Sequence, residues 1–124
     1  MFKLGLLKIP VTDLERAAAF YRDVLGFTEV FVVVEYGWGQ FQVDELPIAL
    51  YVPGMGGGDR QPGGSIDFHL EVSDVEACHD AWVEQGAVIP AGVVRSDEGS
   101  SFFEVTDPDG NALKITQAEE SDAG

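Results

Sequence analysis

The spacing of apolar residues alternates along the chain between a helical period and a strand period. A spacing of three to four residues predicts amphipathic helices at about 13–25 and 74–85. Elsewhere the period is two, as in strands with one buried face. This pattern predicts strands near 4–11, 28–36, 38–44, 47–53, 66–72, 87–94, 101–106 and 112–117. We therefore predict an α+β fold in which each half contains one strand, one helix and then three strands.

An internal repeat supports this division into halves. The segment Val11-Thr12-Asp13-Leu14-Glu15 is similar to Val72-Ser73-Asp74-Val75-Glu76, which lies 61 residues later. In each copy a Thr or Ser precedes a Glu by three residues, the capping-box pattern of a helix start. Gly26 and Gly86 then provide the two helix ends. Because self-similarity at a fixed offset indicates one structural unit used twice, we predict two tandem βαβββ modules.

Glycine-rich sequence separates the two modules. We assign module one to residues 1–53, a flexible glycine-rich linker to 54–64, module two to 65–118 and an acidic tail to 119–124. A chain of 124 residues has enough apolar sequence for one shared core, so we treat 1–124 as a single domain. The three consecutive glycines are not expected to bind phosphate, because no P-loop Lys-Ser/Thr follows them.

Alternation within the strands separates an apolar face, expected to pack on the helices, from a second, mixed face. The mixed face combines polar, charged, aromatic and a few aliphatic residues, namely Leu6, Lys8, Pro10, Ala49, Tyr51, Asp67, His69, Glu71, Phe102, Glu104, Thr106, Ala112, Lys114 and Thr116. On an open antiparallel sheet this face would simply be solvated. Because the module occurs twice, the alternative is that two mixed faces line a shared ligand-binding cleft.

Charge and cysteine content limit the classes of partner. Seven basic and 22 acidic residues give a net charge of −15, which opposes binding to nucleic acid. The acidic excess suits a cationic ligand, but equally a salt-rich cytoplasm or solubility alone. The single cysteine, Cys78, excludes an intrachain disulfide and favours a reducing, cytoplasmic location. No apolar run is long enough to span a membrane, so we expect no membrane partner.

Several motifs resemble those of the vicinal oxygen chelate superfamily, which includes glyoxalase I, extradiol dioxygenases and the fosfomycin and bleomycin resistance proteins. The resemblance covers about residues 4–117, and its motifs are Val11–Ala17, Phe20-Tyr21, Leu25-Gly26-Phe27 and Phe103–Asn111. Within the last motif, Asp-Pro-Asp-Gly also predicts a tight turn between two strands on physical grounds. The resemblance implies paired βαβββ modules with cup-shaped sheets, usually in a homodimer.

The resemblance also implies a metal site in which each module provides two ligands. It places Leu6, Ala49, Asp67 and Lys114 at the four ligand positions. Of these side chains only the Asp67 carboxylate can bind a divalent metal ion. We therefore expect no metal or other cofactor. We hypothesise that Lys114 takes the place of the metal and pairs with Asp67, the alternative being that its ammonium group reaches solvent.

A shifted register leaves a metal-dependent alternative open. Asp67, His69 and Glu104, together with Glu71, share one face and include ligands suitable for a divalent metal ion. Three of the four lie on one strand, however, where residues two apart are separated by about 6–7 Å. This spacing does not favour convergence on one ion.

Aromatic residues favour a binding function. Tyr51 and Phe102 are predicted on the mixed face, and Trp38 in a hairpin of the first module. Such rings near the carboxylates of the mixed face would suit a planar or cationic molecule through stacking and cation–π contacts. We predict ligand-binding residues at Trp38, Tyr51, Asp67, His69, Glu71, Phe102, Glu104 and Lys114.

The resemblance to the bleomycin resistance branch implies metal-independent binding of a small organic molecule, such as sequestration of a cationic or aromatic antibiotic. The alternative is a metal-dependent glyoxalase-like lyase, isomerase or dioxygenase with relocated ligands. No catalytic residue can be assigned, because Cys78 falls on the apolar face of a helix and no nucleophile–base pair is evident.

Overall fold

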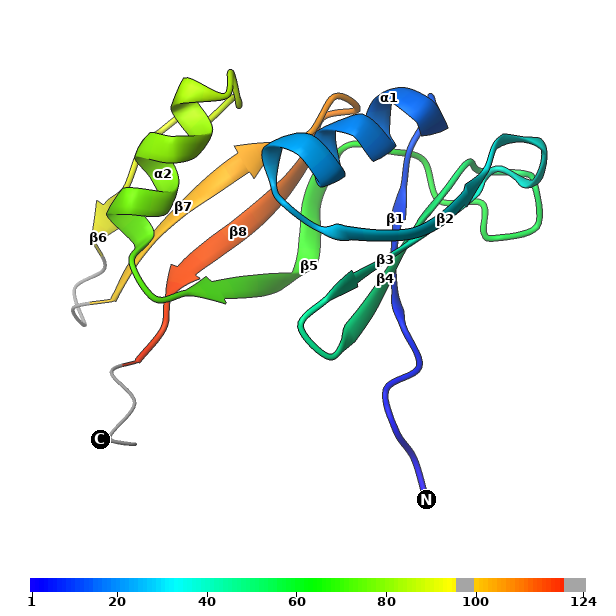
Figure 1. Cartoon of the computed structure of the whole chain (residues 1–124), viewed down its shortest axis with the longest axis horizontal. Coiled ribbons are helices and arrows are strands. Elements are labelled where there is room, and N and C mark those ends of the chain that lie inside the picture. Colours follow the sequence, from blue (N-terminus) through cyan, green and yellow to red (C-terminus); the bar gives the residue numbers. More distant parts are fainter. Residues whose placement is uncertain (96–99, 120–124) are drawn as a thin grey trace. The chain divides into compact units, whose positions relative to one another are not determined.

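The computed structural model describes residues 1–95 and 100–119 and divides the chain into two compact units, Met1–Gly63 and Gly64–Gly124. The first unit consists of β1 (Leu7–Pro10), α1 (Leu14–Ala19), the π-helical segment η1 (Phe20–Val24), β2 (Thr28–Val33), the 3₁₀ segment η2 (Val34–Tyr36), β3 (Trp38–Val43) and β4 (Leu46–Tyr51). The second consists of β5 (Gly64–Val72), α2 (Val75–Glu84), β6 (Val94–Arg95), β7 (Ser101–Thr106) and β8 (Asn111–Gln117). The predicted α+β fold with two βαβββ modules is confirmed (Figure 1).

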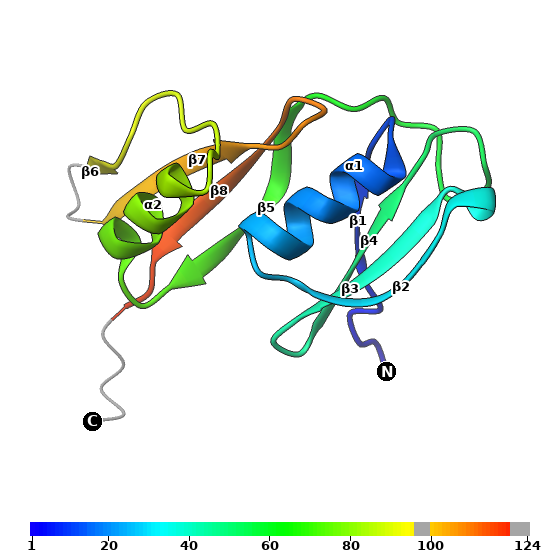
Figure 2. The ribbon, with the colours of Figure 1, turned by 45° about the horizontal axis from the view of Figure 1, so that its top comes forward.

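Each unit has one four-stranded mixed sheet. The strand orders are β1-β4-β3-β2 and β5-β8-β7-β6. In both sheets the first strand of the unit pairs in parallel with the last, and the other neighbours are antiparallel. Figure 2 shows each helix along one face of its own sheet, α1 against β3 and β4, and α2 against β7 and β8. Within each unit, the described residues place no helix of that unit on the opposite face of its sheet.

The apolar residues that alternate along the strands form the core beneath each helix. Ile9, Ile48 and Leu50 in the first unit, and Phe103 and Ile115 in the second, have no exposed surface. These are the positions that the period of two assigned to the helix-packing face, as expected when successive side chains point to opposite faces.

Each helix begins one residue later than the capping-box pattern predicted. The N-cap side chains belong to Asp13 and Asp74, which accept hydrogen bonds from the amides of Arg16 at 3.1 Å and Ala77 at 3.0 Å. The predicted Thr/Ser caps were therefore wrong, because a carboxylate at the next position satisfies the free amides equally well. Positive φ angles of 81° at Gly26 and 88° at Gly86 agree with the predicted helix ends.

The strand predicted at 87–94 is mostly absent. Val88 makes one isolated bridge with Thr106, and regular pairing begins only at β6. Pro90 lacks the amide hydrogen needed for a sheet, and Gly92 has a φ of 68°, outside the strand region. The intervening residues form a loop along the edge of β7. Of the predicted acidic tail at 119–124, residues 120–124 lie outside the described residues.

The first part of the glycine-rich segment folds back onto the first unit. The amide of Gly54 donates to the carbonyl of Gly58 at 3.0 Å, and the ammonium of Lys8 donates to the carbonyl of Gly57. A Cβ at Gly57 would lie 2.9 Å from Cβ of Tyr51, so the backbone approaches that side chain too closely for any other residue type. Among the described residues, no helix is both long and apolar enough to cross a bilayer.

Candidate functional site

The helix-free face of the second sheet gathers most of the predicted ligand-binding residues. Strand pairing places Lys114 on β8 directly opposite His69 on β5 and Glu104 on β7. The next pairs along the strands join Thr116 to Glu71 and to Phe102. Directly opposed side chains on one face of a sheet lie about 4.5–5.5 Å apart at Cβ. Five of the eight predicted residues, His69, Glu71, Phe102, Glu104 and Lys114, are therefore neighbours on one surface.

Lys114 contacts an aromatic ring rather than a carboxylate. Its ammonium nitrogen lies 4.4 Å from the centroid of the Phe102 ring, a cation–π geometry. Although Glu104 is its direct neighbour in register, the described residues contain no ion pair between the two side chains. The Glu104 carboxylate is exposed and has no hydrogen-bond or ion-pair partner within the described part of the chain.

The hypothesis that Lys114 pairs with Asp67 is wrong for this structure. The pairing of β5 with β8 is irregular between Ser65 and His69, because four steps along β5 correspond to two along β8. His69 consequently takes the position opposite Lys114, and Asp67 lies within the irregular stretch. Asp67 remains exposed. The constant strand register on which the prediction depended does not hold at this point.

A small cavity adjoins this face. Its volume is about 160 Å³, and one wall comes from the loop before β6 and the other from β7 and β8. The lining residues are Pro90, Ala91, Gly92, Val94, Phe102, Phe103, Glu104, Thr106 and Ala112. Apart from Glu104 and Thr106 these residues are apolar, so the cavity offers one carboxylate on an otherwise apolar wall.

Strand alternation predicted the residues of the sheet wall of this cavity but not those of the loop wall. Residues 90–92 were assigned to a strand, whereas they form a loop between the Val88–Thr106 bridge and the Val94–Phe102 pair. Pro90 and Gly92 were the available signals for a loop, since both residue types interrupt strands.

The donor set of this face does not form a metal site. Asp67, His69 and Glu104 all lie in the described residues, and within these residues no three His, Cys, Asp or Glu side chains are placed to hold a metal ion. The four positions that the resemblance assigns to metal ligands offer only one donor, Asp67. The described residues on this face therefore do not fit the metal site that the resemblance implies.

The two predicted aromatic residues of the first unit have different surroundings. Trp38 and Tyr51 are cross-strand partners on β3 and β4, and only 5% of the Tyr51 surface is exposed. The glycine segment covers the Tyr51 ring, because a Cβ at Gly58 would lie 2.9 Å from it. The Lys8 ammonium lies 5.2 Å from the centroid of the same ring. Trp38 is half-buried and keeps part of its surface accessible.

Cys78 lies on α2, on the opposite side of the second sheet from the mixed face. Its side chain is half-buried, and burial raises the pKa of its thiol. A thiol with a raised pKa is largely protonated near neutral pH and is a poor nucleophile. This agrees with its predicted structural position.

Paired βαβββ units, each with a mixed sheet covered by a helix on one face, define the class of protein to which the chain belongs. A family model described as the Glyoxalase/Bleomycin resistance protein/Dioxygenase superfamily matches residues 3–115. The chain belongs to this superfamily, and the resemblance noted in the sequence is confirmed.

Solved structures with the same fold are similar over nearly the whole chain. A superfamily member from Sphaerobacter thermophilus is 24% identical, with a TM-score of 0.83 over 95% of this chain and 98% of that chain. A lactoylglutathione lyase from Agrobacterium tumefaciens is 19% identical, with a TM-score of 0.77 over 95% and 96% of the two chains. A glyoxalase/bleomycin resistance protein/dioxygenase from Nocardioides is 16% identical, with a TM-score of 0.78 over 98% and 86%. No curated protein matches the chain.

Proposed function

We propose that the protein binds a small organic cation with a planar or apolar body, without a metal ion, on the helix-free face of the second unit. The observation that carries this proposal is the Glu104 carboxylate, which has no partner within the described residues and lies on the wall of an apolar cavity. A cationic group beside this carboxylate would gain an ion pair, and the body of the ligand would contact Ala91, Val94 and Ala112.

The volume of the cavity limits the size of the ligand group that it can bind. A volume of about 160 Å³ corresponds to roughly five water molecules at about 30 Å³ each. It therefore accommodates one ring or one short chain, while the rest of a larger ligand lies across the sheet beside Lys114. Cationic antibiotics with planar groups belong to this class of ligand, and the superfamily includes resistance proteins.

The charge of the second half of the sequence supports a cationic ligand. Residues 64–124 contain 14 acidic and two basic residues, whereas residues 1–63 contain eight acidic and five basic residues. On the proposed face the carboxylates of Glu71 and Glu104 outnumber the one ammonium group of Lys114. Such an excess raises the local concentration of cations and opposes anionic ligands.

The experiment uses benzamidine, a planar cation, and the uncharged benzamide as its matched control. We expect benzamidine, added to protein treated with EDTA, to shift amide signals of β7, β8 and residues 90–94 in ¹H–¹⁵N NMR spectra, and benzamide to bind more weakly. Glu104→Gln should weaken benzamidine binding about two- to fivefold, the range of an exposed ion pair. Glu84→Gln, on the helix that covers the opposite face, should leave the affinity unchanged.

Two results would contradict the proposal. The first is no saturable shift at β7 and β8, or an equal response to benzamide. The second is binding that disappears with EDTA and returns with a divalent metal, which would favour the metal-dependent glyoxalase-like alternative instead.

A further inference from the structure

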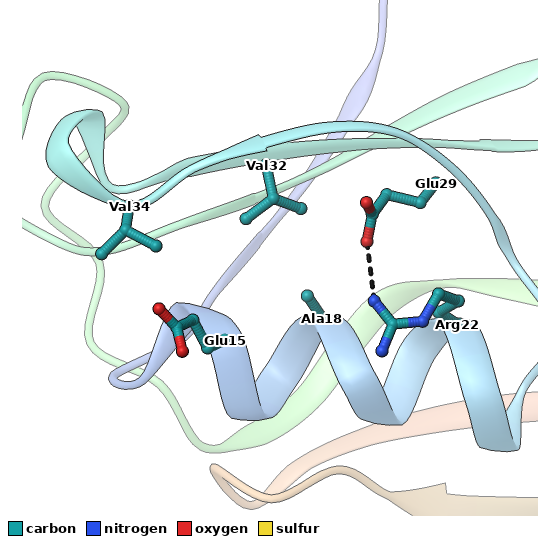
Figure 3. A pocket seen from close by; sticks show the side chains of 6 residues that line it. All are labelled: Glu15, Ala18, Arg22, Glu29, Val32 and Val34. Carbon is teal, nitrogen blue, oxygen red and sulfur yellow. Dashed lines mark hydrogen bonds and ion pairs between the residues drawn. The ribbon is translucent and has the colours of Figure 1, made fainter.

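A second cavity lies in the first unit, between the helical segment and the edge strand β2. Its volume is about 410 Å³, and six residues line it: Glu15, Ala18, Arg22, Glu29, Val32 and Val34. Figure 3 shows Glu15 near Val34 at one end and Arg22 facing Glu29 at the other, with Ala18 and Val32 between them. We call this cavity the α1–β2 groove.

A β-bulge places Glu29 in the groove. The register between β2 and β3 shifts between Glu29 and Phe31, so Glu29 lies opposite Phe41, which is fully buried, while Phe31 lies opposite Gln40. With strict alternation, Glu29 would share a face with Phe31 and point away from the helix. The bulge turns it toward α1 instead, and bulges commonly re-aim a side chain next to a functional site.

The helix is also irregular where it borders the groove. Arg22 lies in the π-helical segment η1, in which the amide of Leu25 donates to the carbonyl of Phe20 at 3.2 Å. Single π-helical turns are rare in α-helices as a whole, but those that occur are often found at functional sites. The corresponding helix of the second unit, α2, is α-helical over its whole length. Two separate local distortions therefore meet at this groove.

The charged groups of the groove leave one carboxylate without a partner. The Arg22 guanidinium bonds to Asp23 at 2.8 and 3.0 Å and to Glu29 at 2.9 Å, which compensates its charge. These bonds hold the pKa of Asp23 below its usual value. Glu15, at the far end, has no hydrogen bond or ion pair with any described residue. The carboxylates of Asp23, Glu29 and Glu15 outnumber the one guanidinium of Arg22, so the net charge of these four side chains is negative.

We propose that the α1–β2 groove binds a small organic monocation whose ammonium group pairs with Glu15 and whose apolar body lies on Ala18, Val32 and Val34. The apolar side chains lie between the two charged ends, so a chain or ring attached to the ammonium replaces water over them. The negative local charge selects a cation over an anion of equal size. This site lies within the first unit and does not depend on the function proposed for the second.

The probe is 2-phenylethylammonium, and 3-phenylpropionate, of similar size and opposite charge, is its control. In ¹H–¹⁵N NMR titrations of the full chain, we expect the cation to give saturable shifts at residues 15, 18, 22, 29, 32 and 34, and the anion to give none there. Glu15→Gln should weaken binding of the cation about two- to fivefold. Glu45→Gln, an exposed residue in the β3–β4 turn, should not change it.

Three results would overturn the inference: no saturable shift in the α1–β2 groove, an equal response to the anion, or an unchanged affinity in Glu15→Gln. Shifts confined to β7 and β8 would also overturn it, while they would support the function proposed for the second unit. Because Glu15 is exposed, its replacement by Gln leaves the fold intact, and the spectrum of the variant verifies this directly.

Discussion

Asp107 organises the turn between β7 and β8 through its buried carboxylate. Only 3% of its surface is exposed, and the carboxylate accepts hydrogen bonds from the amides of Asp109 at 2.8 Å and Asn111 at 2.9 Å. It also accepts one from the Asn111 side chain at 2.8 Å, and Asn111 is itself fully buried. The Asp-Pro-Asp-Gly sequence predicted a turn here, but not that its first residue would be a buried acceptor for donors of Asp109 and Asn111.

Replacing Asp107 by Ala should therefore destabilise the protein. Buried donors that lose their acceptor cost about 1–3 kcal/mol, so we expect the free energy of unfolding in urea to fall by about this amount. Asp59→Ala removes an exposed carboxylate near the end of the first unit and should change the free energy of unfolding by less than about 0.5 kcal/mol. Equal effects of the two substitutions would show that the turn does not depend on the Asp107 carboxylate.

Individual side-chain positions were predicted well where a strand is regular. Alternation placed Glu104 and Lys114 on one face, and the pairing of β7 with β8 places them directly opposite each other. It failed at Asp67, because the pairing of β5 with β8 contains an irregularity that no local residue pattern indicates. Register depends on which residues of two distant strands meet, and this is determined by packing over the whole sheet.

At the level of elements, the glycine segment 54–58 acts as a cover for the end of the first sheet. A Cβ at Gly57 would lie 2.9 Å from Cβ of Tyr51 and 3.0 Å from two ring carbons of Trp38. Composition alone predicted a flexible linker. The contact could not be predicted, because it depends on the backbone of one element approaching the side chains of two others.

Gly57→Ala should displace this segment. We expect a loss of about 1–3 kcal/mol in the free energy of unfolding, typical of overpacking, with a change in tryptophan fluorescence because Trp38 loses its cover. Gly5→Ala is the matched control, since a Cβ at Gly5 meets nothing within 4 Å. If both variants were as stable as the original protein and gave the same fluorescence, the close approach at Gly57 would be unimportant for stability.

On the scale of the whole molecule, the repeat and the change of apolar period predicted the order of elements in both units. What the prediction missed is the detail of irregular segments. The bulge in β2 depends on how distant strands pair, and at 90–92 the apolar alternation outweighed the loop signals of Pro90 and Gly92. These irregular segments border both of the cavities described above, which explains why the fold was easier to predict than the sites.

The net charge of −15 should make stability depend on salt. Like charges repel one another in the folded state, and added salt shortens the Debye length to about 10 Å at 0.1 M. We expect the thermal midpoint Tm to rise between about 0.02 and 0.3 M NaCl, and to rise equally with KCl because screening depends on ionic strength. A Tm that is constant or falls over this range would show that repulsion among the acidic residues does not limit stability.

The bulge in β2 has a consequence for how this protein can diverge. One inserted residue reverses the side to which every earlier position of that strand points. Deleting Val30 would turn the carboxylate of Glu29 to the opposite side and leave Arg22 with Asp23 alone, although only one residue of the sequence had changed. A one-residue insertion or deletion in β2 can thus create or remove this ion pair without any substitution at Glu29 or Arg22.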